Sequence, residues 1–191
     1  GKVPTTVFTA SSSGPGVDAA DHAVVLDFAA EQSVVSTRFA TSCLAVMRSH
    51  YGQDLSAAIA DAEAMLQVAV TEMAKAEQIS FLGMGWTIAM ANEAALKTRE
   101  MAQYWAESHP AMDYRHGPIS IAQPGRMVWS FGPAPKNLQA DVEKTGAVFE
   151  TRPVDPMAHL VLAHRVAVEI AKLHGTNPDQ PRHLTKSVVL T

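Results

Sequence analysis

A short apolar run that ends in glycines and leads into a helical pattern constrains the fold more than any other feature. Residues 79–85, Ile-Ser-Phe-Leu-Gly-Met-Gly, have the length and composition of a buried strand that stops at a tight turn. The sequence predicts a helix from Thr87 to about Trp105. Strand, glycine turn and helix in this order open a doubly wound unit. The glycines alone do not indicate a dinucleotide site, because the third glycine and a later acidic residue at a strand end are absent.

The elements that follow this helix alternate between strands and helices. Strands are predicted at residues 127–131 and 147–151, and helices at residues 138–145 and 157–174. The segment between the first helix and residue 127 is predicted as a loop, which includes His116. Alternation of this kind is typical of parallel strands joined by helical crossovers. The predicted fold class is therefore α/β, a doubly wound parallel sheet flanked by helices in three layers, as in flavodoxin-like proteins.

The beginning of the chain resembles the middle of an α/β unit. Residues 3–10 and 23–28 are predicted as short buried strands, and residues 37–49 as a helix. The serines and glycine at residues 11–14 resemble a phosphate cradle, but Pro15 removes one N–H group and no helix start is expected there. We therefore predict a plain loop at this point. Because the chain opens directly on a strand, we expect that an N-terminal part is absent.

Three parts are expected along the chain. Residues 1–53 form the remnant of a first domain, residues 54–176 a second domain, and residues 177–191 a C-terminal tail. An alanine-rich helix over residues 55–77 is predicted as the link between the two domains. The tail is polar but finishes in an apolar stretch, so we expect it to dock back onto the body.

The composition excludes several functional classes. Hydrophobic residues make up 47% and charged residues 18%, which is typical of a soluble globular protein. A net charge of −4 without a cluster of Lys and Arg gives no indication of nucleic-acid binding. No apolar run reaches the roughly 18 residues of a membrane helix, and no signal peptide is recognisable. The single cysteine, Cys43, excludes an internal disulfide, is expected to be a buried thiol, and fits a cytoplasmic protein.

The residues best suited to chemistry lie on the helix predicted after residue 87. Glu93, Lys97 and Glu100 are four and then three residues apart, which places them on one helix face. His116 follows in a loop by composition. Two carboxylates around an ammonium, with an imidazole nearby, can move protons at neutral pH. A solvated helix face has the same spacing, and a helix-capping role is the alternative for His116, so the spacing leaves both interpretations open.

Lys186 and a pair of histidines are the other candidates for binding or catalysis. Lys186 lies in the tail, where a solvated end is the usual outcome, but a tail lysine can also bind phosphate or assist a carbonyl reaction. His159 and His164 are five apart and do not have the spacing of two metal ligands on one helix face. We expect neither a metal nor an organic cofactor.

Four stretches together resemble the double sugar-isomerase (SIS) domain family. The resemblance is greatest to the isomerase part of glucosamine-6-phosphate synthase and to the glucosamine-6-phosphate deaminases of the same superfamily. It covers nearly the whole chain in order and approximate spacing, and it is specific only when the four stretches are taken together. They are residues 31–38, 92–100, 106–118 and 179–188.

The resemblance implies a role for four side chains. Glu100 matches the glutamate that moves a proton between C1 and C2 of the open-chain sugar, and Lys97 matches the lysine beside it. His116 matches the histidine linked to ring opening. Lys186 matches the tail lysine that closes on the sugar. In the family the histidine loop reaches the neighbouring subunit's site, so the resemblance also implies a homodimer.

Further positions are implied to bind the substrate. Val35 and Ser36 match residues that contact the sugar, Thr37 lies in the same turn, and Glu93 is a supporting residue. This turn reads Val-Ser-Thr-Arg where the family has Ala-Ser-Thr-Lys. The family's serine-rich phosphate loop has no counterpart in the sequence, and no glutaminase domain is present.

The expected function is therefore a phosphosugar aldose–ketose isomerase or deaminase acting on a hexosamine 6-phosphate. One alternative is a non-catalytic SIS module or regulator that only binds a sugar phosphate. Another is a catalytically inactive fragment, since the phosphate loop is missing. The presence of both Glu100 and His116 favours the enzyme, because a sensor needs no proton shuttle.

Overall fold

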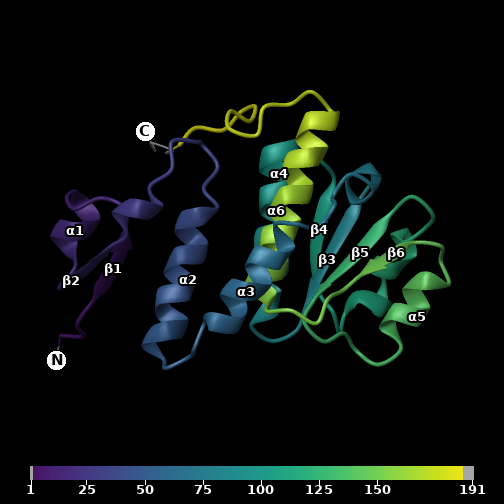
Figure 1. The fold of residues 1–191 in the computed structure, drawn as a ribbon, viewed down its shortest axis with the longest axis horizontal. Helices are drawn as coiled ribbons and strands as arrows, with labels where there is room; N and C mark the ends of the chain where they lie inside the picture. Colours follow the sequence, from purple (N-terminus) through teal and green to yellow (C-terminus); the bar gives the residue numbers. More distant parts are fainter. Residues whose placement is uncertain (1, 187–191) are drawn as a thin grey trace. The chain divides into compact units, whose positions relative to one another are not determined.

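The computed structural model describes residues 2–186, which form two compact units (Figure 1). Ser56–Leu184 make up the larger unit, and residues 2–55 with residues 185–186 make up the smaller one. The predicted three parts, residues 1–53, 54–176 and 177–191, stay a prediction, and the apolar end of the tail lies outside the described residues.

The larger unit is built on a four-stranded parallel sheet. This confirms the predicted α/β class with a parallel sheet. The strand order is β4-β3-β5-β6. The strands are β3 (Ile79–Gly83), β4 (Ala106–Pro110), β5 (Met127–Phe131) and β6 (Val148–Glu150).

Strand β4 corrects the prediction of a loop after the first helix. Its sequence, Ala-Glu-Ser-His-Pro, lacks the apolar run of a buried strand. It pairs only with β3 and lies at the edge of the sheet, where polar side chains and a terminal proline are tolerated. An edge strand of this kind gives no apolar signal in the sequence.

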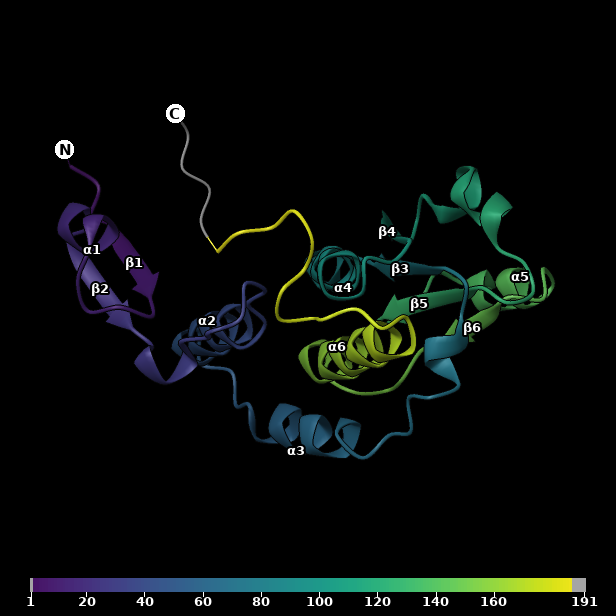
Figure 2. The same ribbon diagram turned by 90° about the horizontal axis from the view of Figure 1, so that it is seen from above.

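Helices cover both faces of this sheet (Figure 1). Helices α4 (Thr87–Ala102) and α6 (Pro156–Leu173) lie side by side on one face, as Figure 2 also shows. The other face carries α5 (Leu138–Glu143) and two short 3₁₀ turns, η3 (Tyr114–His116) and η4 (Pro118–Ile121). The core on the α4 side contains the rings of Phe81, Trp129, Phe131 and His159. The core on the α5 side includes Leu82, Tyr114, Val128, Leu138 and Val142.

The turn between β3 and α4 fixes where α4 begins. A Cβ atom at Gly83 would lie 2.2 Å from the backbone oxygen of Thr87, so only glycine allows the helix to start this close to the strand. The Thr87 hydroxyl donates a hydrogen bond of 2.9 Å to the carbonyl of Phe131 at the end of β5. Helix α4, which carries the candidate acid–base residues, is thereby tied to two strands.

The single linking helix predicted over residues 55–77 is wrong. Helix α3 (Ser56–Met65) ends early, and only a short 3₁₀ turn, η2 (Met73–Lys75), follows. Nη1 of Arg165 on α6 donates hydrogen bonds of 2.7 Å to the carbonyls of both Met65 and Val68. These carbonyls thus bond a side chain of α6, which is a tertiary contact that the local sequence does not reveal.

The smaller unit contains a parallel pair of strands and two α-helices. Its elements are β1 (Thr6–Thr9), α1 (Pro15–Ala19), β2 (His22–Val25), the 3₁₀ turn η1 (Asp27–Ala29) and α2 (Arg38–His50). The expectation that no helix starts at Pro15 is wrong, because proline suits the first helical position and α1 begins there. Cys43 on α2 is half-buried, and this burial raises the pKa of its thiol. No helix within residues 2–186 combines the length and apolar character that crossing a bilayer requires.

Candidate active site

Helix α4 carries a lysine between two carboxylates. The Nζ atom of Lys97 lies 2.8 Å from Oε2 of Glu100 and 3.8 Å from Oε1 of Glu93. The side chain of Lys97 is only 10% exposed, that of Glu93 21% and that of Glu100 23%. A lysine is rarely buried to this degree unless it is paired. The spacing is therefore realised as a largely desolvated charge cluster, in contrast to a solvated helix face.

Glu93 is the carboxylate with the unusual surroundings. Its Oε1 atom is buried and accepts no hydrogen bond within the described residues. Burial is the main cause that raises the pKa of Glu93; Lys97 opposes this, and the negative charge of Glu100 adds to it. A carboxyl group in such a position is suited to hold a proton closer to neutral pH than an exposed glutamate.

His116 ends the 3₁₀ turn η3 and is exposed. Its backbone N–H donates to the carbonyl of Asp113 at 2.9 Å, and the preceding Tyr114 is fully buried and anchors the turn. Among residues 2–186 the structure shows no hydrogen bond or ion pair between His116 and Glu100. The structure thus places the imidazole on a well-anchored turn with its ring open to an incoming group.

The turn that precedes α2 is closed by one glutamate. The Glu31 carboxylate accepts hydrogen bonds of 3.0–3.1 Å from the backbone N–H groups of residues 37–39, and one of 3.2 Å from the Thr37 hydroxyl. Burial opposes ionisation of Glu31, but these hydrogen bonds outweigh it and lower the pKa of the carboxyl. The loop enclosed in this way contains Val35, which is buried, and Ser36, which is half-buried.

Lys186 lies beside the same turn in the smaller unit. Its ammonium donates a hydrogen bond to the backbone carbonyl of Glu31. Lys186 and Ser36 also line one small cavity of about 310 Å³. Glu31 therefore holds the Ser36 loop through its carboxylate and Lys186 through its carbonyl. The role of Glu31 is not predictable from the sequence, because a carboxylate that caps a helix from six to eight residues upstream leaves no local signature.

The structure thus brings the proposed site residues together in two groups. Glu93, Lys97 and Glu100 form a cluster in the larger unit, which also carries His116. Val35, Ser36 and Thr37 share the Glu31 turn with Lys186 in the smaller unit. Within residues 2–186, no three His, Cys, Asp or Glu side chains group in a way that would hold a metal ion.

The chain is similar to curated aminotransferases over about two thirds of its length. No family model matches the chain. It is 27% identical over 158 residues to the glutamine–fructose-6-phosphate aminotransferase [isomerizing] of Brucella melitensis, which covers 67% of the chain and 26% of the relative. The corresponding protein of Aeropyrum pernix is 28% identical over 162 residues, covering 70% of the chain and 26% of that relative. The chain is a homologue of the sugar-isomerase (SIS) part of these aminotransferases. This SIS homologue spans only about a quarter of the length of both relatives.

Solved structures show the same fold. The glucosamine-6-phosphate deaminase of Thermotoga maritima superposes with a TM-score of 0.77 at 23% identity, covering 97% of the SIS homologue and 66% of that chain. The tagatose-6-phosphate ketose/aldose isomerase of Escherichia coli gives a TM-score of 0.69 at 17% identity, with coverages of 97% and 63%. At these identities the likeness shows the fold, which is the SIS fold of phosphosugar isomerases.

Proposed function

We propose that the chain is the C-terminal portion of a phosphosugar isomerase or aminosugar-phosphate deaminase that acts on a hexosamine 6-phosphate. The observation that carries this proposal is the cluster on α4, in which Lys97 lies between Glu93 and Glu100 in a largely desolvated position. Homology to the isomerase part of the aminotransferases supports it. So do the names of the structural relatives, which include both an isomerase and a deaminase.

In the proposed mechanism Glu100 is the base that moves a proton between two carbons. Its carboxylate removes the proton from the carbon next to the carbonyl. The electron pair of that C–H bond forms a C=C bond, and the π electrons of the carbonyl move onto its oxygen to give an enediolate. The proton of the adjacent hydroxyl moves to this oxygen, and the carboxyl group delivers a proton to the former carbonyl carbon, which completes the isomerisation without any co-reactant. The proton held by the carboxyl group can exchange with solvent before it is delivered. The Lys97 ammonium stabilises the negative charge on oxygen, because it acts in a partly dry site. In a deaminase, water additionally replaces the amino group and ammonia leaves.

The other predicted residues are assigned to binding and ring opening. His116 transfers protons during ring opening, and its exposure fits a site completed by a second subunit in a homodimer. Lys186 contacts the open-chain sugar beside Ser36, in the cavity that both residues line. We place residues 1–53 at the end of a first SIS domain, residues 54–176 in a second, and residues 177–191 in a tail that closes over the substrate. We place the enzyme in the cytoplasm.

The proposal is tested by proton exchange in D₂O. Wild-type protein is incubated with glucosamine 6-phosphate and fructose 6-phosphate, and incorporation of deuterium at C1 and C2 is followed by NMR. We expect Glu100→Gln to abolish exchange while calorimetric binding stays nearly unchanged, whereas Glu63→Gln on the exposed side of α3 has no effect. Wild-type exchange in Glu100→Gln would exclude the base role.

Two further readouts separate the candidate functions. Release of ammonia from glucosamine 6-phosphate identifies a deaminase, and its absence together with exchange identifies an isomerase. Binding of sugar phosphate by wild-type protein without any exchange would instead support the non-catalytic module.

A further inference from the structure

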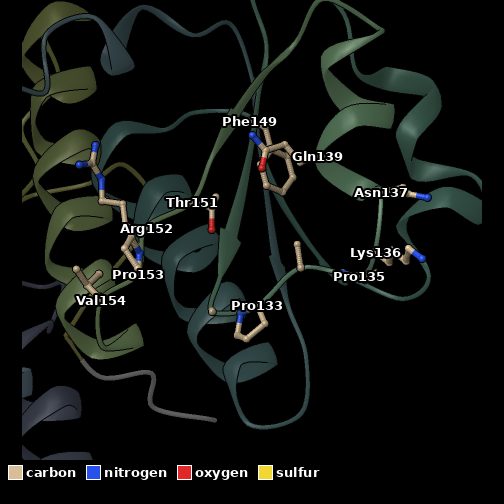
Figure 3. A pocket seen from close by; sticks show the side chains of 12 residues that line it. Pro133, Pro135, Lys136, Asn137, Gln139, Phe149, Thr151, Arg152, Pro153 and Val154 are labelled. Carbon is tan, nitrogen blue, oxygen red and sulfur yellow. The ribbon is translucent and has the colours of Figure 1, made fainter.

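A cavity of about 610 Å³ is lined by none of the candidate residues described above (Figure 3). Two loops of the larger unit form it: residues 132–137 after β5, together with Gln139, and residues 151–154 after β6, together with Phe149. Both loops follow the carboxyl ends of parallel strands, which is where α/β sheets bind their ligands. The volume is also within the range of small-molecule sites, about 300–1,000 Å³.

The lining of this cavity contains cations and no acidic residue. Figure 3 shows Arg152 on one side and Lys136 on the other, with Phe149 and Thr151 between them. Prolines and the Phe149 ring supply apolar surface, while Thr151 and the amide of Gln139 supply hydrogen-bonding groups. This combination suits a small organic molecule that carries an anionic group on an apolar or hydroxylated body.

The guanidinium of Arg152 is held in place by a chain of polar contacts that starts in the core. Trp129 Nε1 donates to Nδ1 of His159 at 3.3 Å, so the proton of the neutral imidazole lies on Nε2, which is 3.2 Å from Oε1 of Glu150. Glu150 in turn accepts a hydrogen bond of 2.7 Å from Nε of Arg152. His159 is fully buried, and this burial lowers the pKa of its imidazole. Because these contacts already hold the guanidinium in place, it loses little conformational entropy when an anion binds it.

The cavity is also joined to the turn that carries His116. The guanidinium of Arg115 donates a hydrogen bond to the carbonyl of Lys136 in the first cavity loop. Arg115 Nε lies 3.6 Å from Oδ2 of Asp141 on α5, the helix that follows this loop. Arg115, which precedes His116 in the chain, is therefore bonded both to the cavity loop and to the helix after it.

We propose that this cavity is a second binding site, for a small organic monophosphate, and that its occupancy is transmitted to His116 through Arg115. Binding at this site does not depend on the proposed isomerase activity. The transmitted effect gives the site a regulatory role, because it acts on the residue proposed to open the sugar ring. The two claims are tested separately.

Binding is tested with phenyl phosphate, whose dianion suits Arg152 and Lys136 and whose ring suits Phe149. Amide spectra of the 191-residue chain are recorded by NMR during titration, with benzyl alcohol as the neutral control. We expect saturable shifts in residues 132–139 and 149–154 with a Kd of about 1 mM, and much weaker binding of benzyl alcohol. Absence of saturable shifts in both loops, or equal binding of the neutral compound, would overturn the site.

Variants locate the binding and test the link. Thr151→Trp fills the cavity from an exposed position and should weaken binding at least about tenfold, while Thr71→Trp on a distant turn should not. Lys136→Gln, which removes one charge without filling space, should weaken it about threefold or more. Unchanged affinity in both Thr151→Trp and Lys136→Gln contradicts the assignment.

The link to His116 is tested with Arg115→Met. The wild-type amide signals of residues 115–116 should move with the same midpoint as those of the cavity loops. In Arg115→Met the loop shifts should remain and the shift of His116 should disappear. A His116 shift that persists in this variant would exclude transmission through Arg115.

Discussion

The Nζ atom of Lys97 lies 2.8 Å from Oε2 of Glu100 and a full 1 Å farther, at 3.8 Å, from Oε1 of Glu93. The ammonium therefore pairs with one carboxylate and leaves an oxygen of the other buried without a hydrogen bond. This asymmetry gives the two glutamates different environments on the same helix face. Different environments give two carboxyl groups different pKa values, so one site can hold an acid and a base at the same pH.

Replacing Lys97 by Met should destabilise the larger unit by about 3 kcal/mol, because breaking a buried ion pair leaves charge without compensation. Glu93 and Glu100 would then repel each other, so the pKa of Glu93 should rise further. The deficit should shrink as the pH falls and the carboxyl groups are protonated. Urea unfolding at several pH values measures this.

The matched control for that experiment is Lys172→Met. Lys172 pairs with Glu169 at 3.4 Å, but its side chain is 67% exposed. We expect a change of less than about 1 kcal/mol, as for other surface pairs. Equal losses in the two variants would show that Lys97 is energetically an ordinary surface lysine.

Glu31→Gln should loosen the start of α2. The amide can accept hydrogen bonds through one atom only, so at least part of the cap over residues 37–39 is lost, at a cost of about 1–2 kcal/mol. We expect amide hydrogen exchange at residues 37–39 to accelerate about tenfold at neutral pH. The exposed substitution Glu72→Gln should leave these rates unchanged.

The same variant has a defined pH dependence. Because hydrogen bonds lower the pKa of Glu31 in the fold, its contribution is fully present above the unfolded pKa near 4.5 and is lost as the pH falls through the folded value. Exchange rates in wild type and Glu31→Gln should therefore converge in acid. Rates that differ equally at neutral and acidic pH would contradict the assigned cap.

The fold was predictable where strands are buried on both faces. The apolar runs of β3 and β5 predict both strands directly, and the glycines at and after the end of β3 predict the start of α4. Strand β4 was missed because an edge strand can be polar. The end of α3 was missed because Arg165, about one hundred residues later, takes the carbonyls of Met65 and Val68.

The candidate site was predictable to the level of residue type and helix face. Spacing on α4 placed Glu93, Lys97 and Glu100 together, and the structure bears out that arrangement. Spacing says nothing of burial, which distinguishes this cluster from a solvated face and sets Glu93 apart. Glu31 needed the structure, because its partners follow it by six to eight residues across an irregular turn.

Tyr104 should make the larger unit sensitive to alkali. Its hydroxyl donates to the carbonyl of Ala76, and burial, followed by the negative charge of Glu77, raises its pKa to about 12. The stability tied to this proton is present below the unfolded pKa near 10 and is lost as the pH rises toward 12. Tyr104→Phe should cost about 1 kcal/mol at neutral pH and remove much of the alkaline loss.

Absorbance of tyrosinate provides the measurement. Burial raises the pKa of both Tyr104 and Tyr114, so the late phase of the titration should lose amplitude in Tyr104→Phe without disappearing. Tyr51→Phe is the control, because Tyr51 is exposed and its removal should leave the late phase unchanged. A late phase of unchanged amplitude in Tyr104→Phe would show that the high pKa belongs to another residue.

Among glycine-to-alanine substitutions in the larger unit, Gly83→Ala should lower the unfolding free energy most. The added Cβ would lie 2.2, 2.4 and 2.6 Å from backbone atoms of Thr87 and Ile88, and backbone at a helix start cannot move aside as a side chain can. We expect a loss of about 3 kcal/mol in unfolding free energy, together with loss of the Thr87–Phe131 hydrogen bond. Gly117→Ala, where the Cβ meets nothing within 4 Å, is the control and should be nearly neutral for stability. The start of α4 also positions Lys97 and Glu100. When a stabilising solute partly restores the stability of Gly83→Ala, proton exchange on the sugar phosphate should therefore stay impaired. Full recovery of exchange would show that the start of α4 does not position the cluster.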